Sequence, residues 1–206
     1  MQNTELTKRQ ESRAASSTTT AFLAGPALMA GYGVVRLTGQ ALGDYGPGLW
    51  WSLAHLLFLA GVLAFVPVFL GLRLPAGVRG GRRAAVRVAA GAGLLGTAAV
   101  AVQASTDLAA GFLAADEQAM SDLFDKVQDV PGVMPVVYTA VPALFWIGLL
   151  ALVSLLALFR RDEVPGWSPL LVTAGIVLMA MSLDLLAAGA LCIGAALFPV
   201  RRGLRV

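Results

Sequence analysis

The stretch "SLDLLAAGAL", from Ser182 to Leu191, places an aspartate inside a long apolar run. A nearly identical phrase, "STDLAAGFLA" at Ser105 to Ala114, lies inside another apolar run, so Ser-x-Asp-Leu is followed closely by Ala-Ala-Gly twice. A charged carboxylate that faces lipid at the centre of a membrane helix costs at least about 2.5–3.5 kcal/mol. We therefore expect both aspartates to point into a helical membrane bundle and away from lipid.

The overall composition is that of a membrane protein. Of the 206 residues, 58% are hydrophobic and only 13% are charged, whereas a soluble domain has about 25% charged residues. The single cysteine, Cys192, excludes an intramolecular disulfide and a thiolate metal cage. The single histidine, His55, excludes a two-histidine haem or metal site within one chain. The sequence therefore predicts no cofactor and no metal.

Five apolar runs are long enough to cross a bilayer, which needs about 20 helical residues. They predict an all-α transmembrane bundle, and their approximate bounds are 20–37, 48–72, 84–115, 133–159 and 168–200. Residues 20–200 would form one domain. The polar segment 1–19 is predicted to be a disordered tail, and 201–206 is a basic tail. We interpret the first run as a retained anchor and not as a cleaved signal peptide.

Arginine and lysine residues predict the orientation of these spans. Ten of them precede the first run, separate the second from the third, or separate the fourth from the fifth. If the spans alternate, all ten face the cytoplasm, together with the N-terminus. The connection between the third and fourth runs contains five acidic residues and one lysine, and we expect it to face outward.

The C-terminal tail conflicts with this scheme. Five spans place Arg201, Arg202 and Arg205 outside the cell. A re-entrant hairpin that bends near Asp184 would return them to the cytoplasm. Its limbs would have about sixteen residues each, too few to cross the bilayer, and no Gly or Pro turn marks the bend. We therefore favour five spans.

The helices that precede the two phrases also match. When Ala54–Arg73 is placed over Val141–Arg160, seven positions are identical. Each segment is followed by a basic connection and then by a run with Ser-x-Asp-Leu, which suggests a duplicated helix pair with the first span added. Transporters often contain such repeats, with sites at the repeat interface, but duplication is also a simple way to build a bundle.

Several polar residues are predicted to share one depth in the outer half of the membrane. With a rise of 1.5 Å per residue, His55 lies about 10 Å below the outer surface and Asp107 at a similar depth. Asp184 lies about 24 Å above the cytoplasmic start of its run. The predicted cluster consists of Arg36, His55, Gln103, Asp107 and Asp184. We expect His55 and Gln103 to contact Asp107, and Arg36 or backbone groups to contact Asp184.

Two uses of this cluster stay open. A histidine beside a carboxylate is suited to proton exchange near neutral pH, so the cluster could relay protons or cations, or bind a small substrate. Alternatively, its hydrogen bonds only hold helices together. For Arg36 the alternative is that its guanidinium extends to the headgroups.

The predicted outer connection contains an amphipathic helix over about 115–130. Its apolar positions are Met120, Leu123, Phe124 and Val127. Its other side contains Asp122, Asp125 and Asp129. This acidic face is either a solvated surface or a cation site. Trp50 and Trp51 are predicted to anchor the second span at the membrane interface.

Motifs for catalysis or nucleotide binding are not supported. Gly91-Ala-Gly93-Leu-Leu-Gly96 matches the dinucleotide fingerprint, but that motif must follow a strand. Here it lies inside an apolar helix, so close helix packing explains the glycines. The basic connection around Arg73–Arg87 either attracts anionic headgroups or only orients the protein. The sequence contains no HExxH motif, no P-loop and no Ser/His/Asp set, so we expect neither an enzyme nor a nucleic-acid-binding protein.

The chain resembles multipass membrane proteins of high-GC bacteria in the order of three segments. These are the stretch "LAHLLFLAGVLAFVPVFLGLR", a basic connection, and an Ala/Gly-rich helix that contains Asp-Leu. That resemblance implies an inner-membrane location but no activity. Our leading interpretation is a structural or partner-binding subunit, which could form an oligomer through small residues such as Ala190-x-x-x-Gly194. The alternative is a small transporter or proton-coupled carrier. A water-accessible cavity that reaches Asp107 and Asp184 would favour transport, whereas a dry bundle with both acids paired would favour structure.

Overall fold

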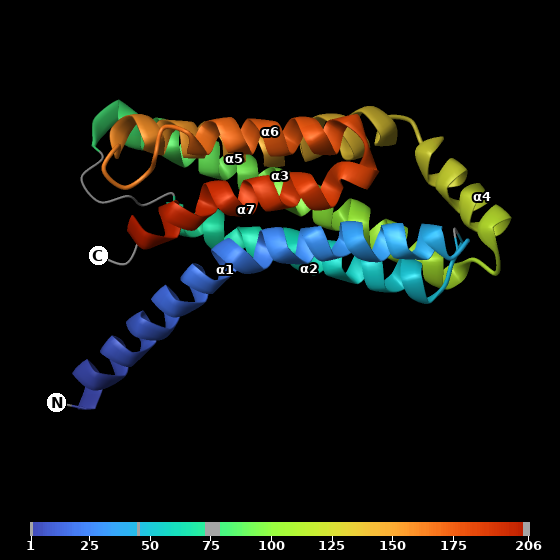
Figure 1. The fold of residues 1–206 in the computed structure, drawn as a ribbon, viewed down its shortest axis with the longest axis horizontal. Coiled ribbons are helices and arrows are strands. Elements are labelled where there is room, and N and C mark those ends of the chain that lie inside the picture. The colour runs from blue at the N-terminus through green and yellow to red at the C-terminus, as the bar shows by residue number, and fades with distance from the viewer. Residues whose placement is uncertain (1, 45, 73–78, 204–206) are drawn as a thin grey trace.

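The computed structural model describes residues 2–44, 46–72 and 79–203, with side chains from Thr20 to Arg201, and within them the chain is an all-helical bundle (Figure 1). The helices are α1 (Gln2–Ala41), α2 (Leu49–Leu72), α3 (Gly80–Leu113), α4 (Glu117–Gln128), the π-helix η1 (Val133–Ala140), α5 (Val141–Phe159), α6 (Ser168–Met181), the 3₁₀-helix η2 (Leu183–Leu185) and α7 (Leu186–Gly203).

Five of the described helical segments are long and apolar enough to span a membrane, as the sequence predicted. They are Thr20–Ala41, Leu49–Leu72, Gly80–Leu113, Val133–Phe159 and Leu183–Arg201. The first four agree with the predicted runs to within a few residues at each end. The fifth differs, because it begins at Leu183 and not at Ser168.

The N-terminal segment also differs from the expectation. We expected disorder over 1–19, but α1 is helical from Gln2. This segment contains no glycine and no proline, and it contains several good helix formers such as Glu, Gln, Leu and Arg. In Figure 1 the N-terminal part of α1 extends away from the bundle.

The prediction of one continuous span over 168–200 is wrong, because the run folds into a helical hairpin. Helix α6 ends at Met181, and Ser182 has an extended backbone with φ −161° and ψ 141°. The Ser182 Oγ accepts a hydrogen bond from the Asp184 N–H at 3.1 Å. Ser182 thus caps the segment that follows, so a serine makes the turn for which we had expected Gly or Pro.

The two limbs of the hairpin pack closely. A Cβ placed on Gly175 of α6 would lie 2.6 Å from the carbonyl oxygen of Gly189 in α7, so the backbones touch at two glycines. The limbs have 14 and 18 residues, where we expected about sixteen each. Helix α7 has the length of a span, and the shorter α6 lies beside it.

The hairpin resolves the conflict for Arg201, whereas Arg205 and the Arg202 side chain lie outside the described residues. Figure 1 shows the start of α3, the connection between α5 and α6, and the end of α7 at one end of the bundle. Helix α4 and the connection between α1 and α2 lie at the other, the α4 end. Arg82, Arg160 and Arg201 therefore share what we call the basic end. Arg82 lies over the Phe159 ring, 5.1 Å from its centroid, which joins the start of α3 to the end of α5.

Both chain termini should consequently lie on one side of the membrane. Reporters fused separately to the N-terminus and to the C-terminus should be accessible from the same side of sealed vesicles. A cysteine at the exposed position Ser121 of α4, introduced with Cys192→Ala, should react only from the opposite side. A C-terminal reporter that is accessible together with Ser121→Cys would contradict the hairpin.

The centre of the bundle contains an aromatic core and a close helix crossing. Phe65, Phe69 and Phe145 are fully buried. The Phe145 ring centroid lies 5.0 Å from that of Phe65 and 5.8 Å from that of Phe69. A Cβ on Gly96 of α3 would overlap the backbone of Phe145 in α5, and one on Gly148 would overlap the backbone of Gly93. Two of the three glycines of the dinucleotide-like motif, Gly93 and Gly96, thus serve helix packing as predicted, whereas a Cβ on Gly91 would meet open space.

The predicted duplication stays a prediction. The paired glycines Gly61 in α2 and Gly148 in α5 both lie at close helix contacts, Gly61 against Met29 and Gly148 against Gly93. The helices that follow differ, since α3 is continuous and the run after α5 is a hairpin.

The predicted amphipathic helix is confirmed as α4. The Asp116 carboxylate caps it by accepting a hydrogen bond from the Ala119 N–H at 2.8 Å. Met120 is 5% exposed. Leu123, Phe124 and Val127 are half-buried, whereas Asp122, Asp125 and Asp129 are exposed. The Asp122 carboxylate accepts a hydrogen bond from the Gln118 amide at 2.9 Å.

Candidate functional site: a polar cavity at the α4 end

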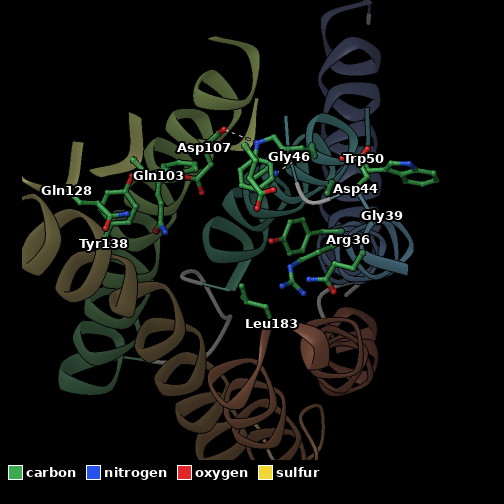
Figure 2. Close-up of a pocket in the computed structure, with 17 residues that line it drawn as sticks. Arg36, Gly39, Asp44, Gly46, Trp50, Gln103, Asp107, Gln128, Tyr138 and Leu183 are labelled. Atoms are coloured by element: carbon green, nitrogen blue, oxygen red, sulfur yellow. Dashed lines mark hydrogen bonds between the residues drawn. The ribbon is translucent and has the colours of Figure 1, made fainter. Parts of the chain in front are cut away.

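A cavity of about 520 Å³ lies at the α4 end of the bundle (Figure 2). Its polar and charged lining consists of Arg36, Gln40, Asp44, His55, Gln103, Asp107, Glu117, Gln128 and Tyr138. The other aromatic residues that line it are Tyr32, Trp50, Trp51 and Phe124. Figure 2 shows Gln103, Asp107 and Tyr138 on one side of this α4-end cavity, and Arg36 on the other.

Asp107 lies on a continuous part of α3 and is half-buried. The Ser105 hydroxyl donates to the carbonyl of Ala101 at 2.7 Å, and the Trp51 Nε1–H donates to the backbone carbonyl of Asp107 at 3.0 Å. The predicted contacts of the carboxylate are not formed, since no hydrogen bond joins it to His55 or Gln103 within the described part of the chain. The carboxylate instead lines the cavity.

His55 is a packed part of the cavity wall. Its ring stacks on Trp51 with centroids 4.1 Å apart and meets Tyr32 edge-on at 5.6 Å. Its Nδ1 lies 2.9 Å from the Trp51 carbonyl oxygen, which can only accept, so Nδ1 is the donor. His55 therefore bonds to its own helix. The expected hydrogen bond from His55 to Asp107 is not formed.

Asp184 joins the predicted cluster through Arg36. The Arg36 guanidinium and the Asp184 carboxylate form an ion pair at 2.5 Å, which confirms the expected partner. The Arg36 side chain is 25% exposed and lines the cavity, whereas Asp184 is 57% exposed. We had expected Asp184 to point into the bundle. It lies at the surface instead, because the hairpin places it at a turn. Of this turn, Leu183 lines the cavity.

Tyr138 is a cavity residue that the sequence reasoning missed. It lies in η1, where the Thr139 hydroxyl donates to the carbonyl of Met134, five residues earlier, at 3.0 Å. Pro142 cannot supply the N–H that the Tyr138 carbonyl would bind in an α-helix. The Tyr138 hydroxyl oxygen is buried without a hydrogen-bond partner among the described residues. Single π-turns are frequent at functional sites, and the proline offered a signal for this one.

Asp44, Glu117 and Phe124 were also missed as cavity residues, because the sequence did not show that α4 and the connection between α1 and α2 meet at the cavity. A Cβ on Gly46 would lie 3.6 Å from the Cβ of Glu117, so the connection between α1 and α2 contacts the start of α4. The rings of Trp51 and Phe124 have centroids 6.0 Å apart, which joins α4 to α2. Helix α4 therefore forms part of the cavity wall.

No protein-family model, curated protein or solved structure matches this chain. The resemblance to membrane proteins of high-GC bacteria accordingly stays an expectation. In residues 2–44, 46–72 and 79–203, no three His, Cys, Asp or Glu side chains are grouped so that they could hold a metal ion.

Proposed function

We propose that the protein is a small-molecule carrier of the bacterial inner membrane and that the α4-end cavity is its substrate site. The observation that supports this most directly is the cavity itself, which reaches Asp107 inside a segment long enough to span the bilayer. An ionisable residue within a span most often marks a substrate or ion pathway. The N-terminus and the basic end face the cytoplasm, following the distribution of arginine and lysine.

The shape of the bundle suits a carrier that is open toward one side. The cavity lies at the α4 end, while Phe65, Phe69 and Phe145 fill the bundle further along α2 and α5 toward the basic end. The turn between α6 and α7 brings Leu183 to the cavity. Opening toward the basic end requires the helices around the phenylalanines to separate.

A structural or partner-binding subunit is the second candidate function. Its expected oligomer face was Ala190-x-x-x-Gly194, but Ala190 is 1% exposed. A Cβ on Gly194 would lie 3.2 Å from the Cβ of Pro26 in α1. These small residues therefore pack within the chain, and an interface between copies would have to use another face.

Accessibility from both sides of the membrane tests the carrier. Gln103→Cys, with Cys192→Ala, places the only thiol at the cavity. In sealed liposomes containing protein of one orientation, a small membrane-impermeant thiol reagent should modify this cysteine from the α4 side. It should also modify it more slowly from the basic side, because a carrier alternates its opening.

Two control variants define the sides. Ser121→Cys on α4 should react only from the α4 side, and Arg83→Cys at the exposed start of α3 only from the basic side. If Gln103→Cys reacts only from the α4 side, the protein is a static bundle and the carrier proposal is wrong.

A further inference from the structure

We infer that the α4-end cavity binds a small organic cation, an ammonium group on an apolar body, and that Asp107 holds its charge. This inference deepens the proposed function and rests on it. It depends on the balance of charge around the cavity, on the cavity's aromatic walls and on its size.

Carboxylates outnumber cations around the cavity. Asp44, Asp107 and Glu117 line it. Arg36 also lines it, but its guanidinium is neutralised at 2.5 Å by Asp184, which is not part of the lining. His55 uses its Nδ1–H within its own helix. The three carboxylates are therefore not balanced by the basic residues described here, and a cation is attracted more strongly than an anion.

The aromatic residues suit an organic cation with an apolar body. Tyr32, Trp51 and Phe124 line the cavity. The Trp51 ring stacks on His55 with centroids 4.1 Å apart and lies tilted to the Phe124 ring with centroids 6.0 Å apart. Aromatic faces attract ammonium groups, and cages of such rings recognise alkylated ammonium ligands. The buried Tyr138 hydroxyl, which lacks a partner among the described residues, can accept a hydrogen bond from an ammonium N–H.

The size of the cavity argues against a bare metal ion. A volume of about 520 Å³ lies within the range of sites for small organic ligands, roughly 300–1,000 Å³. Calcium takes about six to eight oxygen ligands at short distance, whereas the described residues contain no group of three acidic, His or Cys side chains that could hold a metal. An organic ammonium compound fills the volume and uses the rings.

Protection of one cysteine by two probes of opposite charge tests the inference. In Gln103→Cys with Cys192→Ala, modification by a neutral methanethiosulfonate reagent reports access to the cavity. Phenethylammonium at saturating concentration should slow this reaction about tenfold, the factor that corresponds to about 1.4 kcal/mol. The anion 3-phenylpropionate, which has the same 2-phenylethyl group with a carboxylate in place of the ammonium, should leave the rate unchanged at equal ionic strength.

Variants assign the charge that is responsible. Asp107→Asn should abolish protection by phenethylammonium while the unprotected rate of labelling stays the same, which shows that the cavity is intact. Asp122→Asn, on the exposed face of α4, is the matched control and should keep the protection. Asp184→Asn releases Arg36, so protection by phenethylammonium should decrease and protection by 3-phenylpropionate should appear.

The outcomes separate this inference from the carrier proposal. Equal protection by both probes, or by neither, would overturn cation selectivity and leave the two-sided labelling result untouched. Protection by sodium ions alone as strong as that by phenethylammonium would overturn the organic ligand. Protection by phenethylammonium in a protein labelled from one side only would support the cation site and overturn the carrier.

Discussion

Replacing Gly96 by alanine should destabilise the folded bundle by about 2–3 kcal/mol or more, whereas the same replacement at Gly91 should be neutral or slightly stabilising. A Cβ on Gly96 would overlap the backbone of Phe145, which no rotamer change can relieve, so α3 and α5 must separate. Forcing extra atoms into a packed core costs typically about 1–3 kcal/mol and occasionally more. Gly91 has open space around its Cβ position, so alanine there gains up to about 1 kcal/mol of helix propensity.

The two variants form a matched pair, since both positions belong to the same six-residue motif in α3. Reversible unfolding in mixed detergent micelles, followed by tryptophan fluorescence, would give both free energies of unfolding. Opposite signs are expected. Equal stabilities of the two variants would show that α3 and α5 do not cross at Gly96.

Replacing Arg36 by leucine should destabilise the protein by about 1–3 kcal/mol, because Asp184 loses its ion-pair partner at the hairpin turn. Breaking a fully buried pair costs about 3–5 kcal/mol. The effect should be smaller here because the Asp184 side chain is 57% exposed. The loss should be accompanied by easier opening of the turn between α6 and α7, since Arg36 connects α1 to that turn.

A double-mutant cycle isolates this interaction. The variant with both Arg36→Leu and Asp184→Leu should recover most of the stability that Arg36→Leu loses, because it leaves no unpaired charge. The same micelle unfolding measurement gives all four free energies. Losses that simply add would indicate that the two charges do not interact, and the ion pair would then have no part in closing the hairpin.

The local pattern of the sequence was sufficient to predict the class of protein, the first four spans and α4. Each depends on residues that are neighbours in the chain. A run of about 20 apolar residues has the length and composition of a membrane span whatever surrounds it. The spacing of Met120, Leu123, Phe124 and Val127 likewise places them on one face of a helix before any partner is known.

The cavity could be predicted only in part. The rise per helical residue predicted that Arg36 and Asp184 lie at the same depth, and these two residues form an ion pair. The same reasoning placed His55 and Asp107 around one site but could not determine which way their side chains point. The aromatic walls were missed because Tyr32, Trp51, Phe124 and Tyr138 come from four different helices, and nothing in the chain places those helices side by side.

The two Ser-x-Asp-Leu phrases separate most clearly what the sequence determined from what only the tertiary structure decided. Their composition alone indicated aspartates that need polar surroundings. Ser105 donates to the carbonyl of Ala101 and α3 continues, whereas Ser182 accepts from the Asp184 N–H and the helix ends. The same four-residue phrase is compatible with a continuous helix and with a helix end, because a serine hydroxyl can bond to a carbonyl within a helix or cap the start of a new one. Tertiary contacts favour the turn after Met181. Gly189 of α7 packs against α6. Ala187 packs against α1, where a Cβ on Gly33 would lie 2.7 Å from the Ala187 backbone nitrogen.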